Sequence, residues 1–257
     1  MSSPPHVLVT GAGTGIGRAI AHRLARGGAR VSILARTEGN LRDTASEIQA
    51  LGAAAVFVAP CDVQDPIAVD RAVAAAAQAL GPYTAVVAAA GVGGANHPGE
   101  LDRFDTIIAT NLRGTYSTFR AVLRHLRPGP EARHLVAISS ILARIGVGGY
   151  TGYCASKAGI MGMVRAFAHE LAPENVQVNS VCPGWVETDM AWAGIGGMAR
   201  AMNVDRDEAY RIAMSAVPLG RMSQPEHVAG LVAWLLSPDA TGVTGQGLDM
   251  NNGAWMG

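Results

Sequence analysis

The segment His6-Val7-Leu8-Val9-Thr10-Gly11-Ala12-Gly13-Thr14-Gly15-Ile16-Gly17 combines a short apolar strand with a glycine-rich turn. A helix rich in alanine, isoleucine and leucine is predicted to follow, from Gly15 to about Arg26, with Gly27-Gly28 as its stop signal. Glycines let a backbone approach a pyrophosphate closely, and the unpaired N–H groups of a helix start bind it. A purely structural turn is the alternative, but the position between a first strand and a first helix favours dinucleotide binding. The predicted contacts in the turn are Gly11, Thr14, Gly15, Ile16 and Gly17.

Further short β-rich runs follow this unit, with helical segments between them. Most of the runs are continuously apolar, which is typical of strands buried on both faces of a parallel sheet. The alternation predicts an α/β fold, a doubly wound, Rossmann-like parallel sheet of about seven strands with helices on both faces. No linker divides the chain, so residues 1–257 are expected to form a single domain. The predicted strands are His6–Thr10, Arg30–Ala35, Ala54–Ala59, Thr84–Ala90, Arg133–Ser139, Val176–Cys182 and Gln246–Met250.

Composition argues against several classes of function. Lys plus Arg and Asp plus Glu each total 20 residues, so no net charge or basic stripe points to nucleic acid or to a membrane surface. The longest apolar runs are far shorter than the roughly 20 residues that cross a bilayer. Three scattered cysteines fit neither a disulfide framework nor a zinc pattern, and no metal site is predicted. The first six residues lack the features of a signal peptide, and a cytoplasmic location is expected.

The end of the second predicted strand bears on the choice of cofactor. An NAD-preferring site usually places an acidic residue here, where it bonds the ribose hydroxyls. This chain has Ala35 followed by Arg36 and Thr37. Alanine removes a carboxylate that would repel a 2′-phosphate, and a guanidinium pairs well with phosphate. NADP(H) is therefore the predicted cofactor and NAD(H) a possible one. The alternative is that Arg36 is simply solvated and that the site does not discriminate between the two cofactors.

A tyrosine and a lysine four residues apart, Tyr153 and Lys157, lie on one face of a helix predicted from about Tyr153 to Leu171. A free phenol titrates near 10, and a neighbouring ammonium is expected to lower that pKa toward neutrality. Tyr153 could then protonate a carbonyl oxygen that receives hydride. Ser140, at the end of the preceding strand, could steady the same oxygen. Taken alone, the pair also fits a half-buried tyrosine beside a surface lysine.

Residues 189–215 stand apart from the alternating pattern. Asp189 to about Val204 is rich in Gly, Ala and Met, with Trp192 among them. The segment follows the carboxyl end of a strand, where open α/β sheets bind ligands. Backbone freedom and soft apolar side chains predict a mobile substrate lid. An ordinary surface helix and loop is the alternative.

These motifs together resemble the single-domain branch of the short-chain dehydrogenase/reductase family over essentially the whole chain. The order and spacing carry the resemblance more than any single motif. The shared features are the turn from Thr10 to Gly17, Cys61-Asp62-Val63, Ala89-Ala90-Gly91, Asn111, Ser140, Tyr153 with Lys157, and Pro183-Gly184 followed by Thr188.

The resemblance implies a role for each matching residue. Tyr153 resembles the proton donor and acceptor, Lys157 the residue that tunes it and holds the nicotinamide ribose, and Ser140 the anchor of the substrate oxygen. Asn111 matches the asparagine that supports a proton-relaying water chain with Lys157. The remaining implied cofactor contacts are Asp62 and Val63, Ala89, Ala90 and Gly91, and Pro183, Gly184, Val186 and Thr188.

Two departures from the family pattern affect the cofactor. The family commonly has Asn-Asn-Ala-Gly where this chain has Ala88-Ala89-Ala90-Gly91, so polar ties near the adenosine are missing. Thr14 occupies a turn position where many NADP(H)-preferring members carry Arg or Lys. The predicted cofactor preference therefore rests on Arg36, with help from the hydroxyl of Thr37.

The segments 181–190 and 217–221 are similar to those of 3-oxoacyl and polyketide ketoreductases. The resemblance implies reduction of a small-molecule carbonyl, a β-keto thioester or a cyclic ketone. Oxidation of a secondary alcohol or diol with NAD(P)+ is the alternative, and a catalytically idle dinucleotide-binding sensor is a remote one. The family also implies a homotetramer, and the apolar end from Leu248 to Met256 is consistent with a subunit contact.

Overall fold

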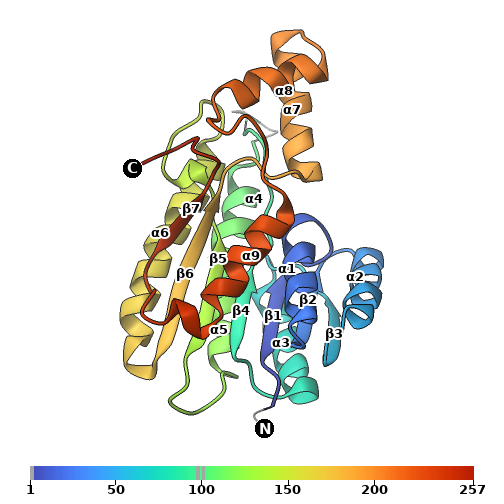
Figure 1. Ribbon diagram of the computed structural model, residues 1–257, viewed down its shortest axis with the longest axis vertical. Coiled ribbons are helices and arrows are strands. Elements are labelled where there is room, and N and C mark those ends of the chain that lie inside the picture. Colours follow the sequence, from blue (N-terminus) through green and yellow to red (C-terminus); the bar gives the residue numbers. More distant parts are fainter. Residues whose placement is uncertain (1–2, 97–98, 100–101) are drawn as a thin grey trace.

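The computed structural model describes residues 3–96, 99 and 102–257, and seven strands within them form one parallel sheet. The strand order is β3-β2-β1-β4-β5-β6-β7, which reverses its direction of growth between β1 and β4 (Figure 1). The predicted α/β, doubly wound, single-domain fold is confirmed. The strands are β1 (His6–Thr10), β2 (Arg30–Ala35), β3 (Ala55–Pro60), β4 (Ala85–Ala88), β5 (Arg133–Ile138), β6 (Val176–Pro183) and β7 (Gly247–Met250).

Helices cover both faces of this sheet. One apolar cluster joins α1, α2 and α9 to one face, and a second joins α3, α5 and α6 to the other. Helices α7 and α8 stand beyond the carboxyl edge of the sheet (Figure 1). The helices are α1 (Gly15–Arg26), α2 (Glu38–Ala50), α3 (Pro66–Leu80), α4 (Phe104–Ile108), α5 (Gly114–Leu123), α6 (Thr151–Leu171), α7 (Asp189–Met202), α8 (Arg206–Ser215) and α9 (Pro225–Leu235).

The continuous apolar character of β1 follows from its central place in the sheet. Successive side chains of a strand point to opposite faces. Val7 and Val9 enter the cluster under α1 and α9, and Leu8 enters the opposite cluster. Both faces of β1 are therefore covered, and every residue of the strand is buried.

Some predicted boundaries are wrong by one or two residues. The fourth strand ends at Ala88 rather than Ala90, because the chain leaves the sheet there to form the wall of a cavity. Ser139 lies beyond the end of β5, and Ser140 is the N-cap residue of the 3₁₀ turn Ile141–Ala143. Helix α6 begins at Thr151, two residues before Tyr153.

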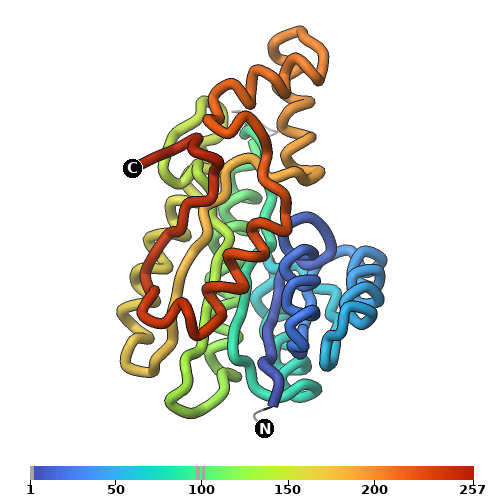
Figure 2. The backbone as a smooth tube through the Cα atoms, in the orientation of Figure 1, coloured from blue at the N-terminus to red at the C-terminus, as the bar shows by residue number. Residues whose placement is uncertain are grey.

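The segment predicted as a glycine-rich lid consists of two helices. Helices α7 and α8 pack on each other and share a third apolar cluster that includes Ile195, Ala209 and Met214. Trp192 stacks on Tyr210, with ring centroids 5.5 Å apart. The helical pair projects from the sheet in the chain trace (Figure 2). Its role as a mobile lid stays a prediction.

In the part of the chain that the structure describes, no helix has both the length and the apolar character needed to cross a membrane. The N-terminal segment judged for a signal peptide lies partly outside the described residues, which begin at Ser3.

Candidate active site

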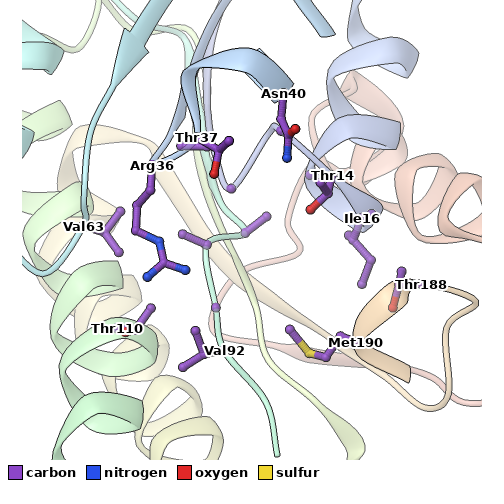
Figure 3. A pocket seen from close by; sticks show the side chains of 18 of the residues that line it. Thr14, Ile16, Arg36, Thr37, Asn40, Val63, Val92, Thr110, Thr188 and Met190 are labelled. Atoms are coloured by element: carbon purple, nitrogen blue, oxygen red, sulfur yellow. The ribbon is translucent and has the colours of Figure 1, made fainter. Parts of the chain in front are cut away.

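A cavity of about 250 Å³ opens at the carboxyl ends of the strands, beside the switch between β1 and β4. Open α/β sheets bind ligands at this kind of position. Most of the predicted cofactor contacts line the cavity, and Figure 3 labels several of them. The predicted residues that line it are Gly11, Thr14, Gly15, Ile16, Gly17, Arg36, Thr37, Asp62, Val63, Ala89, Ala90, Gly91 and Thr188.

Glycines in the first turn allow three segments to meet at the cavity. Gly11 has a φ of +67°, and a Cβ there would lie 2.7 Å from the Cα of Ala90. A Cβ on Gly15, whose φ is +53°, would lie 3.2 Å from Cγ2 of Thr188. Side chains at these positions would force the turn away from its neighbours. The turn, the wall after β4 and the segment before α7 are therefore held close together.

The N-terminus of α1 is open toward the cavity. Thr14 is its N-cap residue, but its hydroxyl caps no N–H group, and the first turn contains no acidic side chain. The first N–H groups of a helix have no partner within the helix and carry partial positive charge. Gly15, Ile16 and Gly17, whose N–H groups these are, all line the cavity. The arrangement can hold an anionic group such as a pyrophosphate.

Arg36 directs its side chain into the same cavity. Figure 3 shows its guanidinium reaching toward Val63 and Thr110 from the end of β2. Ala35 and Thr37 flank it on the lining, so its nearest neighbours in sequence carry no charge that would compete with a phosphate. Arg36 itself is exposed. It offers the cavity a cation that can bind a phosphate in bidentate fashion.

Asn111 and Lys157 meet at the cavity wall formed by Gly91. A Cβ on Gly91 would lie 3.3 Å from Oδ1 of Asn111 and 3.6 Å from Nζ of Lys157. Asn111 lies in a π-helical turn between α4 and α5. Its Oδ1 accepts the N–H of Val92 at 2.8 Å, and its Nδ2 donates to the carbonyl of Val92 and to Oγ of Ser156. Asn111 thereby fixes the backbone next to the cavity.

Lys157 and Tyr153 lie on the same face of α6, with Nζ 5.5 Å from the centroid of the phenol ring. The ammonium is buried and donates to the carbonyl of Ile138 at 2.8 Å. Burial lowers the pKa of Lys157 to about 8, so loss of its proton comes within reach of mildly alkaline pH. The helix places both groups beside the end of β5.

The predicted direction of the Tyr153 shift is wrong for this structure. Burial of the phenol raises the pKa of Tyr153, and a hydrogen bond with Ser140 opposes that rise without cancelling it. The ammonium of Lys157 is directed to the Ile138 carbonyl rather than to the phenol oxygen. Ser140 is buried at the end of β5, where its Oγ accepts the N–H of Leu142. Ser140, Tyr153 and Lys157 are nevertheless brought together as predicted.

The segment after β6 meets the cavity only through its last part. Thr188 lines it and caps α7 by accepting the N–H of Ala191. Pro183, Gly184 and Val186 do not line it, because they are held against other parts of the chain. A Cβ on Gly184 would lie 3.0 Å from the Cα of Asn251, and Val186 pairs with Ser223.

Several cavity residues were not predicted from the sequence. Asn40 lies in the first turn of α2, and its place just after a strand was an available signal. Thr110 and Met190 carry no motif that identifies them. Thr10 also acts near the site, because its hydroxyl accepts the N–H of Ala90 at 3.2 Å. That bond fixes Ala90 at the end of Ala88-Ala89-Ala90, the stretch in which the family commonly has asparagines.

Among the described residues, no group of three or more His, Cys, Asp or Glu could hold a metal ion. The titratable groups gathered at the site include a phenol, an ammonium and a guanidinium, together with the carboxyl groups of Asp62 and Asp189 on the cavity lining. This set suits proton transfer and the binding of anions.

Comparison with known proteins identifies the family. The family model described as enoyl-(acyl carrier protein) reductase matches residues 11–254. The chain belongs to the short-chain dehydrogenase/reductase family. The chain is 36% identical to the short-chain reductase protein NovJ of Streptomyces niveus, and the match covers 96% of this chain and 92% of that protein. As a member of the family, the chain is an oxidoreductase of carbonyl or hydroxyl groups.

Two further relatives of this short-chain dehydrogenase/reductase are informative. The 3-oxoacyl-[acyl-carrier-protein] reductase MabA of Mycobacterium tuberculosis is 33% identical, over 98% of this chain and 93% of that protein. The crystal structure of an actinorhodin polyketide ketoreductase variant with NADPH superposes with a TM-score of 0.92 at 36% identity, covering 99% of each chain.

Proposed function

We propose that this short-chain dehydrogenase/reductase is an NADPH-dependent ketoreductase. The observation that carries the proposal is one continuous cavity wall. The wall runs from the uncapped start of α1, past the guanidinium of Arg36, to Gly91, where Asn111 and Lys157 meet. The first part suits a dinucleotide carrying an extra phosphate, and the last part lies beside Tyr153. A relative named as a 3-oxoacyl-[acyl-carrier-protein] reductase and a polyketide ketoreductase solved with NADPH support the same assignment.

The residues present fit NADPH by their chemistry. The N–H groups at the start of α1 would hold the pyrophosphate, and Arg36 with Thr37 would hold the 2′-phosphate. The buried ammonium of Lys157 has no carboxylate partner among the described ion pairs, and it would bond the ribose hydroxyls. Asp62, Ala90 and Gly91 would form the wall at the adenosine, and Thr188 would hold the carboxamide. NADPH, when bound, supplies the hydride.

Tyr153 acts in this proposal as the general acid. Its phenol donates a proton to the carbonyl oxygen as that oxygen gains negative charge, and the hydroxyl of Ser140 holds the same oxygen. Burial raises the pKa of Tyr153, so the phenol is protonated at neutral pH but releases its proton less readily than a free tyrosine. Lys157 would favour release of that proton by stabilising the tyrosinate, and a water chain supported by Asn111 and Lys157 would return a proton from solvent.

The proposed substrate is a small-molecule ketone, either a β-keto thioester or a cyclic ketone. The proposal is supported by the relative named as a 3-oxoacyl-[acyl-carrier-protein] reductase and by the polyketide ketoreductase. Met190, which is 48% exposed and lines the cavity, offers apolar contact on the substrate side.

The homotetramer and the cytoplasmic location stay predictions. The described cysteines, Cys61, Cys154 and Cys182, are free thiols.

A cofactor and substrate panel tests the proposal. Purified protein is given NADPH or NADH with β-keto thioesters, cyclic ketones and quinones, and absorbance of the reduced cofactor is followed. We expect consumption of NADPH on one ketone class, with the alcohol formed in equal amount. Preference for NAD+ with free secondary alcohols would instead support a catabolic dehydrogenase. Binding of dinucleotide without turnover in either direction would support an idle binder.

A further inference from the structure

The helix that carries Tyr153 begins without a cap of its own. Its N-cap residue is Tyr150, whose side chain makes no capping bond, and no acidic residue lies in the first turn. Asn96, from the segment that follows β4, supplies the missing acceptor. Its Oδ1 accepts the N–H of Gly152 at 3.0 Å, one residue before Tyr153. A cap satisfies one of the N–H groups that a helix start leaves unpaired.

Further bonds fix the cap in place. Nδ2 of Asn96 donates to Oγ1 of Thr151 at 2.9 Å, and the backbone N–H of Asn96 donates to the carbonyl of Gly149 at 2.8 Å. Asn96 is only 8% exposed. Phe104 of α4 closes the other side, since a Cβ on Gly152 would lie 3.2 Å from its ring. Asn96 therefore holds the start of α6 through several short contacts, of which the bond to the N–H of Gly152 is buried.

The other end of the same segment belongs to the cavity. Gly91 and Val92 line it, and Asn111 binds both the N–H and the carbonyl of Val92. Residues 91–96 thus run from the cavity wall to the first turn of α6. A shift of the first turn of α6 would move the phenol of Tyr153 relative to a cofactor bound in the cavity. Small displacements of a reacting group have large effects on rate.

We propose that Asn96 is a positioning residue that sets the place of Tyr153 for proton transfer. It acts through the N–H of Gly152 and does not line the cavity itself. The inference rests on the proposed function, because it assigns Asn96 a part in the reaction that Tyr153 carries out.

The experiment compares two buried asparagines. Asn96→Ala removes the cap. Asn179 lies within β6, away from the cavity, and its buried amide bonds the backbone of Val243 and Gln246; Asn179→Ala removes that amide. We expect Asn96→Ala to lower kcat about tenfold or more while Kd for NADPH stays within about twofold. Asn179→Ala should keep kcat near the wild-type value, even where thermal unfolding shows that it is equally destabilised.

Rescue separates positioning from general damage. In Asn96→Asp, the carboxylate can accept both the N–H of Gly152 and the hydroxyl of Thr151, so kcat should recover most of the loss. Hydrogen exchange at residues 150–157 should rise in Asn96→Ala and return toward wild type in Asn96→Asp. Equal losses of kcat in the two alanine variants, or a folded Asn96→Asp protein that regains protection but not kcat, would overturn the inference. A wild-type protein that reduces no ketone would instead overturn the proposed function, with the exchange results still reporting on the cap.

Discussion

Arg36 is the side chain on which the proposed preference for NADPH rests. It follows Ala35 at the end of β2, and its guanidinium points into the cavity (Figure 3). Arg36→Ala should weaken NADPH binding about tenfold to a hundredfold, since a charge-assisted phosphate contact contributes about 1.5–3 kcal/mol. NADH, which lacks the 2′-phosphate, should bind almost as before. Fluorescence titration of both cofactors measures the two changes.

The matched control is Arg42→Ala. Arg42 is an exposed arginine on α2 that pairs with Glu38 and does not line the cavity. Its loss should leave both affinities unchanged. Equal weakening of NADPH and NADH by Arg36→Ala would show that the arginine supports the fold of the site rather than the phosphate.

The local sequence predicted which residues gather at the site better than it predicted their electrostatics. The four-residue spacing placed Tyr153 and Lys157 on one face of α6. It could not show that the Lys157 ammonium would donate to Ile138, nor that burial of Tyr153 would outweigh its neighbours. The bond of Lys157 and the pKa shift of Tyr153 both depend on how the folded chain packs around these side chains, which local sequence does not show.

At the scale of elements, the strands and the first helix were predictable because each carries a local signal. The apolar run of β1 and the glycine turn before α1 are continuous in sequence. The helices α7 and α8 were not predicted, since Gly194, Gly196 and Gly197, which lie within α7, suggested a flexible segment. Burial of Ile195 and Met214 in their shared cluster stabilises both helices. Such tertiary packing outweighs weak helix propensity.

The cap of α6 belongs to the same scale and had no sequence signal. Asn96 lies 56 residues before its partner Gly152. Rules for capping examine neighbouring residues, so a cap donated by a distant loop is invisible to them. The chain topology brings the segment after β4 to the start of α6, and only the folded molecule shows the contact.

For the whole molecule, two buried histidines predict how stability depends on pH. Burial is the main cause that lowers the pKa of His6 from 6.5 to about 4, and burial lowers the pKa of His134 to about 4 as well. The unfolded chain therefore binds more protons than the folded one between pH 6.5 and about 4. Stability should fall as pH falls through this window, by roughly 3 kcal/mol for each histidine.

Chemical denaturation from pH 7.5 to 4.5 measures this loss. The carbonyl of Gly81 can only accept, so Nδ1 of His6 carries the proton and Nε2 accepts from the hydroxyl of Ser32. His6→Asn should make the pH dependence markedly shallower. His169→Asn, at an exposed position on α6, should leave it unchanged. A slope that is the same in wild type and His6→Asn would exclude His6 as a cause.

The molecule as a whole brings the carboxyl ends of β1, β2 and β4 to one cavity and sets the first turns of α6 near the same wall. Single-turnover ketone reduction by Tyr153→Phe with bound NADPH tests most directly whether the cavity and the phenol on α6 act together in the reaction. We expect NADPH binding close to wild type and a rate of ketone reduction lower by about 100- to 10,000-fold, the contribution of a general acid. A wild-type rate in this variant would contradict it, because the proton would then reach the carbonyl oxygen without Tyr153.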